Sequence, residues 1–503
     1  MIKNKSGNRL SRYFLYSAAI IMISALGRLL MIGKVGLGDD EAHYWMWSKN
    51  LDWSYFDHPP MVAWVIAFFT AIGGDHEFFV RVGAVLLFLI TSWGAYFLAA
   101  ALKDQKTGFF TVVFLNISPV FSFLGSVLMV PDGPLAAAWV LFLLFFYKAL
   151  QKPHFNKYWI LTGIALGIGV LSKYNAVLLP ISAFLYLLLS KQNRFWLLRK
   201  EPWVALGIGV ILSLPVVYWN AQNHWASFGF QLNHGIGEDH SFSSQLFFQI
   251  LGAQIGYISP ILFFLAWIAV ILSGIKGIKV QDDRYLFLFC FAAPTLLLFN
   301  GIGAFHKILP HWPALGFVTA FIALALWIVE DRPKIKLWVA SAVLSGISLT
   351  LLVPIQALFM VLPYTKSFTA KVDPTNDLYG WPEAASRVNL LQEKMNSKEG
   401  PAFIYSNKFL IADQIGFYTG KSRGVYCFNE DKSQYDFWDD PGGLKGQNAI
   451  FVTDNRYQVD PVEKFGKNFE KIEKEAPIDI YRKGVLIRTF YLYRCYGFKG
   501  IKI

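Results

Sequence analysis

The amino-acid sequence predicts a polytopic α-helical membrane protein with a small α/β soluble domain at its C-terminal end. Of the 503 residues, 55% are hydrophobic and only 16% are charged, whereas soluble domains carry about a quarter charged residues. Long apolar segments recur as far as Leu362, and beyond that residue the composition becomes that of a soluble domain. We therefore expect a transmembrane domain over residues 1–362 and a soluble domain over residues 363–503.

The apolar segments have the length of membrane spans, because a helix needs about 20 residues to cross the ~30 Å hydrocarbon core. We expect about eleven spans, near residues 13–33, 78–102, 108–122, 133–150, 159–172, 174–190, 203–219, 246–273, 285–301, 311–329 and 337–361. Segment 59–72 is either a further span or a helix in the interface. The first segment exceeds signal-peptide length and is interpreted as a retained span.

The formal net charge of +12 does not indicate nucleic-acid binding, because the basic residues follow the positive-inside rule. If the N-terminus is cytoplasmic, the loops on that side contain Lys103, Lys106, Lys148, Lys152, Arg194, Arg199, Lys276 and Lys279. The opposite short loops contain few basic residues. The alternation predicts that the loop over residues 34–77 and the C-terminal domain both face outward, which is the periplasm for a bacterial inner membrane.

The C-terminal region shows short buried strands and an amphipathic helix. PAFIYS, NAIFVTD and VLIRTFYLYRCY are typical of strands, and KFLIADQIGFYTG of a helix that ends at Gly420. Cys427 and Cys495 lie in this region, and the sequence favours free thiols while leaving a disulfide between them open.

The first outer loop holds GDDEAHYWMWSKNLDWSYFDHPP, residues 38–60, with an unusual density of carboxylates and aromatic rings. The carboxylates are Asp39, Asp40, Glu41, Asp52 and Asp57. We interpret Asp39 and Asp52 as solvated and expect the others to act in chemistry. The aromatic side chains are typical either of a sugar-stacking surface or of anchors at the membrane interface.

Three further outer loops contain candidate site residues. Asp132 lies in VPDGPL, Lys173 in LSKYN, and His306, Lys307 and His311 lie in FHKILPHW. The alternatives are structural: the aspartate can cap a helix, the lysine can snorkel, and the turn with two histidines can stay solvated. The lysines and histidines of these loops together are suited to bind a phosphate leaving group. A carboxylate is suited to act as a general base or as a ligand of a divalent metal ion.

The blocks DEAHYW, YFDHPP, VPDGPL, LSKYNAVLL and PHWPAL, in this order on outer loops, resemble the membrane glycosyltransferases of the dolichyl-phosphate-mannose protein mannosyltransferase type. The bacterial branch with the lipid A aminoarabinose transferases is most similar. The resemblance implies a GT-C fold, a polyprenyl-phosphate-linked sugar as donor and inverting transfer on the outer face of the membrane. Lysine occupies the position of His58 in the aminoarabinose transferases.

The resemblance assigns roles to individual residues. It makes Asp40 the general base or metal ligand, with Glu41 assisting. We expect contacts with the donor phosphate from His58, Lys173 and Lys307. The residues expected to position substrate are Asp57, Asp132, His43, Tyr44, Tyr174, His306 and His311.

Several functions stay open at this point. The acceptor is lipid A, another glycan or a protein, and protein O-mannosylation is the alternative within the enzyme class. A flippase of a lipid-linked sugar is the alternative outside it, but it predicts ionisable residues near the membrane midplane. Membrane lipids and the polyprenyl phosphate donor are the expected partners, and nucleic acid is not.

Overall fold

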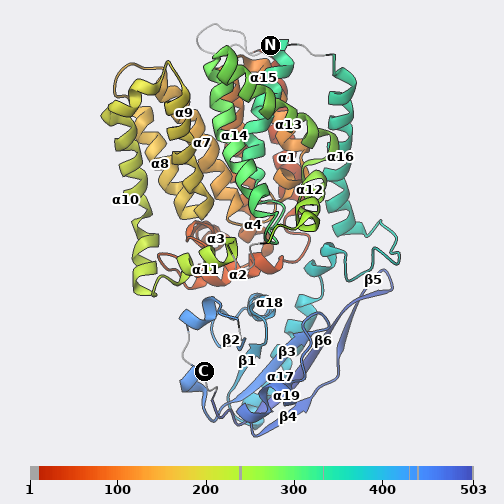
Figure 1. Ribbon diagram of the computed structural model, residues 1–503. Coiled ribbons are helices and arrows are strands. Elements are labelled where there is room, and N and C mark those ends of the chain that lie inside the picture. Colours follow the sequence, from red (N-terminus) through yellow and green to blue (C-terminus); the bar gives the residue numbers. More distant parts are fainter. Residues whose placement is uncertain (1–10, 237–240, 332–333, 430, 439–440, 501–503) are drawn as a thin grey trace. The chain divides into compact units, whose positions relative to one another are not determined.

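The computed structural model describes residues 11–236, 241–331, 334–429, 431–438 and 441–500 (Figure 1). Within them the contacts group into two compact units. The first unit comprises Met1–Leu30, Trp53–Val62 and Arg81–Leu352, and the second comprises Met31–Asp52, Ala63–Val80 and Val353–Ile503. Most of the first outer loop is therefore grouped with the C-terminal segment, and a single domain boundary at residue 362 stays a prediction.

The first unit consists of helices. They are α1 (Arg12–Met31), α4 (Glu77–Leu102), α5 (Gln105–Ile117), α6 (Pro119–Phe123), α7 (Asp132–Leu150), α8 (Lys157–Ser172), α9 (Leu178–Leu189), α10 (Lys200–Gln222), α11 (Ala226–Ile236), α12 (Ser244–Ile258), α13 (Pro260–Ile275), α14 (Asp283–Ile302), α15 (Ala314–Asp331) and α16 (Lys336–Phe359), with a few residues of α1, α4 and α16 in the second unit. Among the described residues, eight helices are long and apolar enough to cross a membrane, and three shorter apolar helices add to them. The predicted polytopic membrane fold is confirmed.

Two predicted spans are each divided in the structure. The segment 246–273 forms α12 and α13, which meet at Ser259 with φ 92°. The segment 108–122 forms α5 and α6, which meet at the extended residue Ser118. A proline follows each junction, and proline disfavours the helical conformation of the preceding residue. Apolar composition alone hides these breaks.

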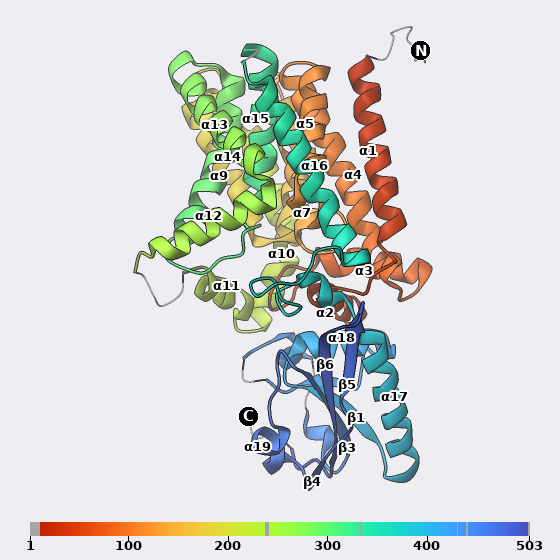
Figure 2. The same cartoon turned by 90° about the vertical axis from the view of Figure 1, so that its right-hand side faces the viewer.

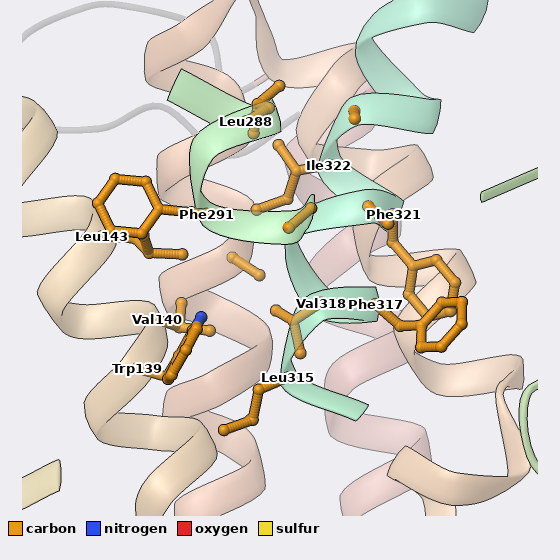
Figure 3. Close-up of a cluster of buried hydrophobic side chains, with 14 of the residues drawn as sticks. Trp139, Val140, Leu143, Leu288, Phe291, Leu315, Phe317, Val318, Phe321 and Ile322 are labelled. Carbon is orange, nitrogen blue, oxygen red and sulfur yellow. The ribbon is translucent and has the colours of Figure 1, made fainter. Parts of the chain in front are cut away.

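Large side chains from α7, α14 and α15 interlock in the core of the first unit (Figure 3). Trp139 of α7, Phe291 of α14 and Phe321 of α15 are completely buried. Because the packing is this close, a side chain in the core cannot shift without moving its neighbours. The core therefore holds the start of α7, where Asp132 lies, in a defined position.

The second unit contains a mixed β-sheet. Its strands are β1 (Ala402–Ser406), β2 (Val425–Cys427), β3 (Asn448–Asp454), β4 (Lys471–Lys474), β5 (Ile478–Arg482) and β6 (Val485–Tyr496), and its helices are α2 (Asp39–Lys49), most of α3 (Met61–Gly73), α17 (Trp381–Lys398), α18 (Phe409–Thr419) and α19 (Pro461–Phe465). The strand order is β2-β1-β3-β6-β4, and β5 pairs with β6. The pairs β1–β2 and β1–β3 are parallel, and β6 is antiparallel to its neighbours.

Both faces of this sheet are covered (Figure 2). Ile404 and Ile450 point to the face on which α17 and α18 pack, and Phe403 and Phe451 point to the opposite face, as the period of two in a strand requires. The strands and the helix predicted for the C-terminal domain are confirmed. Gly420 ends α18 with φ 70°, as expected.

Cys427 and Cys495 are free thiols. Cys427 lies on β2 and Cys495 on β6, and β1 and β3 lie between these strands. Neighbouring strands are about 4.8 Å apart, so the two Cα atoms are farther apart than the ~7 Å that a disulfide allows. The open disulfide is therefore excluded in this fold.

The first outer loop and the C-terminal domain should lie on one side of the membrane, because α2 and α18 pack together in the second unit. An impermeant thiol reagent applied to whole cells should label cysteines introduced at the exposed positions Leu51 and Ser397 equally. Cysteine at Lys152, in a predicted cytoplasmic loop, should stay unlabelled until the cells are opened. Opposite labelling of the first two positions would contradict the contact between α2 and α18.

Candidate active site

Asp132 and Lys173 form an ion pair in the first unit. The lysine Nζ lies 3.0 Å from Oδ1 and 2.8 Å from Oδ2 of the aspartate. Lys173 is only 6% exposed, so the pair is shielded from water and from screening by salt. The sequence placed both residues on outer loops without predicting that they bind each other.

The local chain explains how these two side chains meet. Asp132 is the first residue of α7, and Gly133 after it lies against Gly125, where a Cβ atom would come within 2.5 Å of the Gly133 backbone. Lys173 follows the last residue of α8 in an extended conformation, and its N–H donates to the Gly169 carbonyl. The start of one helix and the end of its neighbour therefore present the pair at the same end of the helix bundle.

His58 and His311 share the electrostatic environment of this pair. Burial lowers the pKa of His58 to about 4, with a further lowering by Lys173, while Asp57 and Asp132 oppose the shift. Burial likewise lowers the pKa of His311 to about 4, against the attraction of Asp132. Both imidazoles are thus uncharged near neutral pH. Lys173 is therefore the cation of the cluster, and the contact of His58 with the donor phosphate stays a prediction.

Helix α11 supports the turn that carries Asp57 and His58. Gln231 donates its side-chain N–H to the Asp57 carbonyl at 2.6 Å, and Phe230 packs against Phe56 with ring centroids 4.7 Å apart. The Tyr174 hydroxyl lies 2.7 Å from the Ser227 hydroxyl of the same helix. Sequence reasoning missed Gln231, because a polar residue on a short helix carries no signal of its partner.

The loop between α14 and α15 carries the remaining predicted residues of the first unit. His306 is partly buried, whereas Lys307 is exposed. Lys307 makes no ion pair within the part of the chain that the structure describes. Its contact with phosphate stays a prediction.

Helix α2 begins with three carboxylates in its first turn, which the positive end of the helix dipole favours. Glu41 is 1% exposed, and its Oε2 accepts a hydrogen bond from the Gly38 N–H at 2.9 Å. Glu41 thus caps its own helix. Asp40 is exposed at the second helical position, so of this pair it is the carboxylate that a substrate can reach.

Asp39 is not a solvated residue. Gln414 of α18 donates to its Oδ1 at 3.0 Å, and burial raises the pKa of Asp39 to about 7 although the nearby Arg488 opposes the shift. The interpretation of Asp39 as a solvated carboxylate is therefore wrong. The adjacent residues Asp39 and Asp40 point to different surroundings because one residue turns a helix by about 100°.

His43 is 3% exposed and Tyr44 is 6% exposed. His43 Nδ1 lies 2.7 Å from Oδ2 of the buried Asp413 in α18, and its ring packs against Phe409 with centroids 4.7 Å apart. This placement argues against direct contact of His43 with substrate. His43 joins α2 to the C-terminal segment instead.

A metal ion at Asp40 stays a prediction. Among the described residues, no group of three or more His, Cys, Asp or Glu side chains has the arrangement to hold a metal. Magnesium, however, is commonly held by one or two carboxylates together with water and substrate phosphates, and the exposed carboxylate of Asp40 fits such a site. The ion would supply a positive charge that neutralises the donor phosphate.

The family described as dolichyl-phosphate-mannose-protein mannosyltransferase matches residues 57–219. This stretch contains Asp57, His58, Asp132 and Lys173. Over this stretch the chain is similar to that family of membrane glycosyltransferases. The matched stretch begins after Asp40, so this similarity does not depend on the predicted catalytic carboxylate.

Two curated relatives are similar to this chain. The lipid A galacturonosyltransferase RgtD of Rhizobium johnstonii is 27% identical over 345 residues, which are 64% of this chain and 66% of the relative. The undecaprenyl phosphate-alpha-4-amino-4-deoxy-L-arabinose arabinosyl transferase of Serratia proteamaculans is 27% identical over 311 residues, which are 57% of this chain and 53% of the relative. The chain thus spans slightly under two thirds of the first relative and about half of the second.

The similarity in fold covers more of the chain than these sequence matches do. ArnT from Cupriavidus metallidurans in the apo state has a TM-score of 0.63 at 14% identity and covers 95% of this chain and 97% of its own. Its structure bound to undecaprenyl phosphate has a TM-score of 0.62 at 15% identity, with coverage of 95% and 98%. The two chains therefore share one architecture across nearly their whole length.

Proposed function

We propose that this protein transfers a sugar from a polyprenyl-phosphate donor to lipid A or another glycan of the cell envelope, with inversion, on the outer face of the bacterial inner membrane. The buried Lys173–Asp132 pair beside His58 and His311 carries this proposal. The curated relatives support the choice of a lipid A or lipopolysaccharide acceptor, because their names give lipid A and an undecaprenyl phosphate sugar.

Lys173 is suited to bind a phosphate at the end of a membrane helix. Its ammonium group has three N–H donors, and the two Asp132 oxygens lie within hydrogen-bond distance of it. Asp132 orients the ammonium, and a remaining donor is available to an incoming oxygen. Because the surroundings are shielded from water, a hydrogen bond from this cation to a phosphate is stronger than at an exposed surface.

The proposed reaction is a direct displacement at the anomeric carbon. An oxygen of the acceptor forms a bond to this carbon from the face opposite the phosphate, and the bond from the carbon to the phosphate oxygen breaks. The electron pair leaves with that oxygen, so polyprenyl phosphate is released with one more negative charge. Lys173 stabilises this developing charge, and His58 donates a hydrogen bond to it.

Asp40 acts on the acceptor. If the acceptor is a hydroxyl group, its proton passes to the Asp40 carboxylate as the new bond forms. If the acceptor is a phosphate of lipid A, there is no proton to remove, and Asp40 acts through orientation or through a metal ion. The two cases differ in how strongly the rate depends on the Asp40 charge.

The decisive experiment is a comparison of lipid A and core oligosaccharide, by mass spectrometry, from cells with and without the gene. The proposal expects one sugar residue to be lost with the gene, and transfer of that sugar by the purified protein in lipid vesicles. A change in protein glycosylation instead would indicate protein O-mannosylation. Movement of the lipid-linked sugar across vesicles without transfer would indicate a flippase.

The affinity for the donor should rise as the pH falls from 7 to 5. The phosphodiester of the donor does not titrate in this range, but its negative charge favours the protonated form of His58. In the free protein, burial and Lys173 lower the pKa of His58 to about 4, while Asp57 and Asp132 oppose this shift. Binding then takes up a proton. His58→Lys places a permanent cation at this position, so it should weaken the dependence of donor affinity on pH and leave only the part due to His311. Donor affinity measured at several pH values checks this.

The opposite dependence would contradict a phosphate contact of His58. The pH also acts on stability, because a histidine whose pKa is lower in the folded than in the unfolded chain destabilises the fold as the pH falls from 6.5 towards 4. Binding should therefore be measured on protein whose folded fraction is checked at each pH.

A further inference from the structure

Helix α18 packs against α2 in the second unit (Figure 2), and it also contacts the segment that leads into α2. Gln414 is completely buried, and its Nε2 donates to the Leu37 carbonyl at 2.8 Å and to Asp39 Oδ1 at 3.0 Å. A single side chain thus holds both the chain just before the helix and the first residue of the helix.

Tyr418 holds the same segment one turn further along α18. Its hydroxyl accepts a hydrogen bond from the Leu37 N–H at 2.9 Å and donates to Glu77 Oε1 at 3.0 Å. Gly36 lies so close that a Cβ atom would come within 2.8 Å of this hydroxyl. The approach of the chain to α2 therefore leaves no room for displacement.

Asp413 holds α2 from the side. It accepts one hydrogen bond from His43 at 2.7 Å and another from the Tyr435 hydroxyl at 2.7 Å. Asp413 is completely buried and His43 nearly so. Breaking this contact would leave a buried polar group without its partner, which is costly.

Helix α2 needs such support. It has eleven residues, and isolated helices shorter than about 12–15 residues are marginal in water. Its N-cap residue is Gly38, which has no side chain to cap the helix, and the Glu41 side chain caps it from within. Without α18 the first turn, which carries Asp40, would fray.

We propose that Asp413, Gln414 and Tyr418, which we call the α18 clamp, are positioning residues that fix the first turn of α2 and so the carboxylate of Asp40. The inference rests on the proposed function for the role of Asp40. The C-terminal domain then takes part in transfer by holding the catalytic helix. A misplacement of about 1 Å can lower a rate by about 100-fold.

The test is Gln414→Met in the full chain, with Gln392→Met as the matched control. Gln392 also uses its side chain in two hydrogen bonds of the second unit, to the Ala402 carbonyl and from Lys421. Gln414→Met should lower kcat by about 10-fold to 100-fold with donor KM changed less than about 2-fold, whereas Gln392→Met should leave kcat near the parent value. Tyr418→Phe should also lower kcat.

Hydrogen exchange provides a second measurement that does not need activity. In Gln414→Met the backbone amides of residues 39–44 should exchange faster, while the amides of β3 stay as protected as in the parent. Equal kcat and equal exchange in α2 for Gln414→Met would overturn the clamp, and so would an equal loss of kcat in Gln392→Met. If the parent protein transferred no sugar from a polyprenyl phosphate, the proposed function would fail, and exchange in α2 would still decide whether the clamp exists.

Discussion

Replacing Asp40 by asparagine is expected to lower the rate of transfer by about 100-fold or more, as the loss of a general base does. The substitution removes the charge and nearly preserves the shape. Asp40 is exposed at the start of α2, while the cap of this helix comes from Glu41. The variant should therefore fold and bind the donor as the parent does, and turnover of purified protein in lipid measures the effect.

Asp52→Asn is the control for this prediction, because it removes a carboxylate from the same loop at a position outside the proposed chemistry. It should change turnover by less than about 2-fold, since Asp52 takes no part in the proposed chemistry. Asp39→Asn is no longer a suitable control, since Asp39 accepts a hydrogen bond from Gln414. Near-normal turnover in Asp40→Asn, or an equal loss in Asp52→Asn, would show that another carboxylate acts.

Lys173→Met is expected to have two separate effects. It removes one member of a buried ion pair and leaves Asp132 uncompensated, which costs about 3–5 kcal/mol of unfolding free energy. It also removes a charge-assisted hydrogen bond to the donor phosphate, worth about 1.5–3 kcal/mol, so donor affinity should fall by about 10-fold to 100-fold. Thermal unfolding measures the first effect, and donor titration measures the second.

The double variant Lys173→Met with Asp132→Leu separates these effects. Removing both charges leaves no buried carboxylate without a partner, so much of the lost stability should return, while donor affinity should stay low. Lys276→Met is the matched control, because Lys276 contacts both oxygens of Asp331 at 2.7 Å but is more exposed. Recovery of donor affinity in the double variant would mean that Lys173 serves the fold alone.

The apolar segments were enough to predict the membrane fold, and with the alternation of basic loops they gave the loops that carry the candidate site. Both signals are local, because a span must be apolar over its own length whatever it packs against. The strands β1 and β3 and the helix α18 were recognisable for the same reason. The breaks at Ser118 and Ser259 were missed because both lie within continuously apolar segments.

The residues of the site were predictable as types but not as partners. Asp132 and Lys173 were chosen because charged residues near a membrane surface are unusual, and their hydrogen bonds to each other appeared only in the structure. The neutral state of His58 was likewise hidden, since its low pKa arises mainly from burial. Burial depends on neighbours that are distant in sequence.

The sequence by itself determined the fold class and predicted which loops face outward and which chemical groups serve the proposed transfer, because each follows from composition and local pattern. Only the tertiary structure decided which of these groups are buried, which are exposed and which are hydrogen-bonded. It grouped α2 with α18 across more than 300 intervening residues, which partly buried Asp39, buried His43 and left Asp40 exposed. A local pattern records which side chains a segment offers, whereas burial, pKa and hydrogen bonding depend on the segments that fold against it.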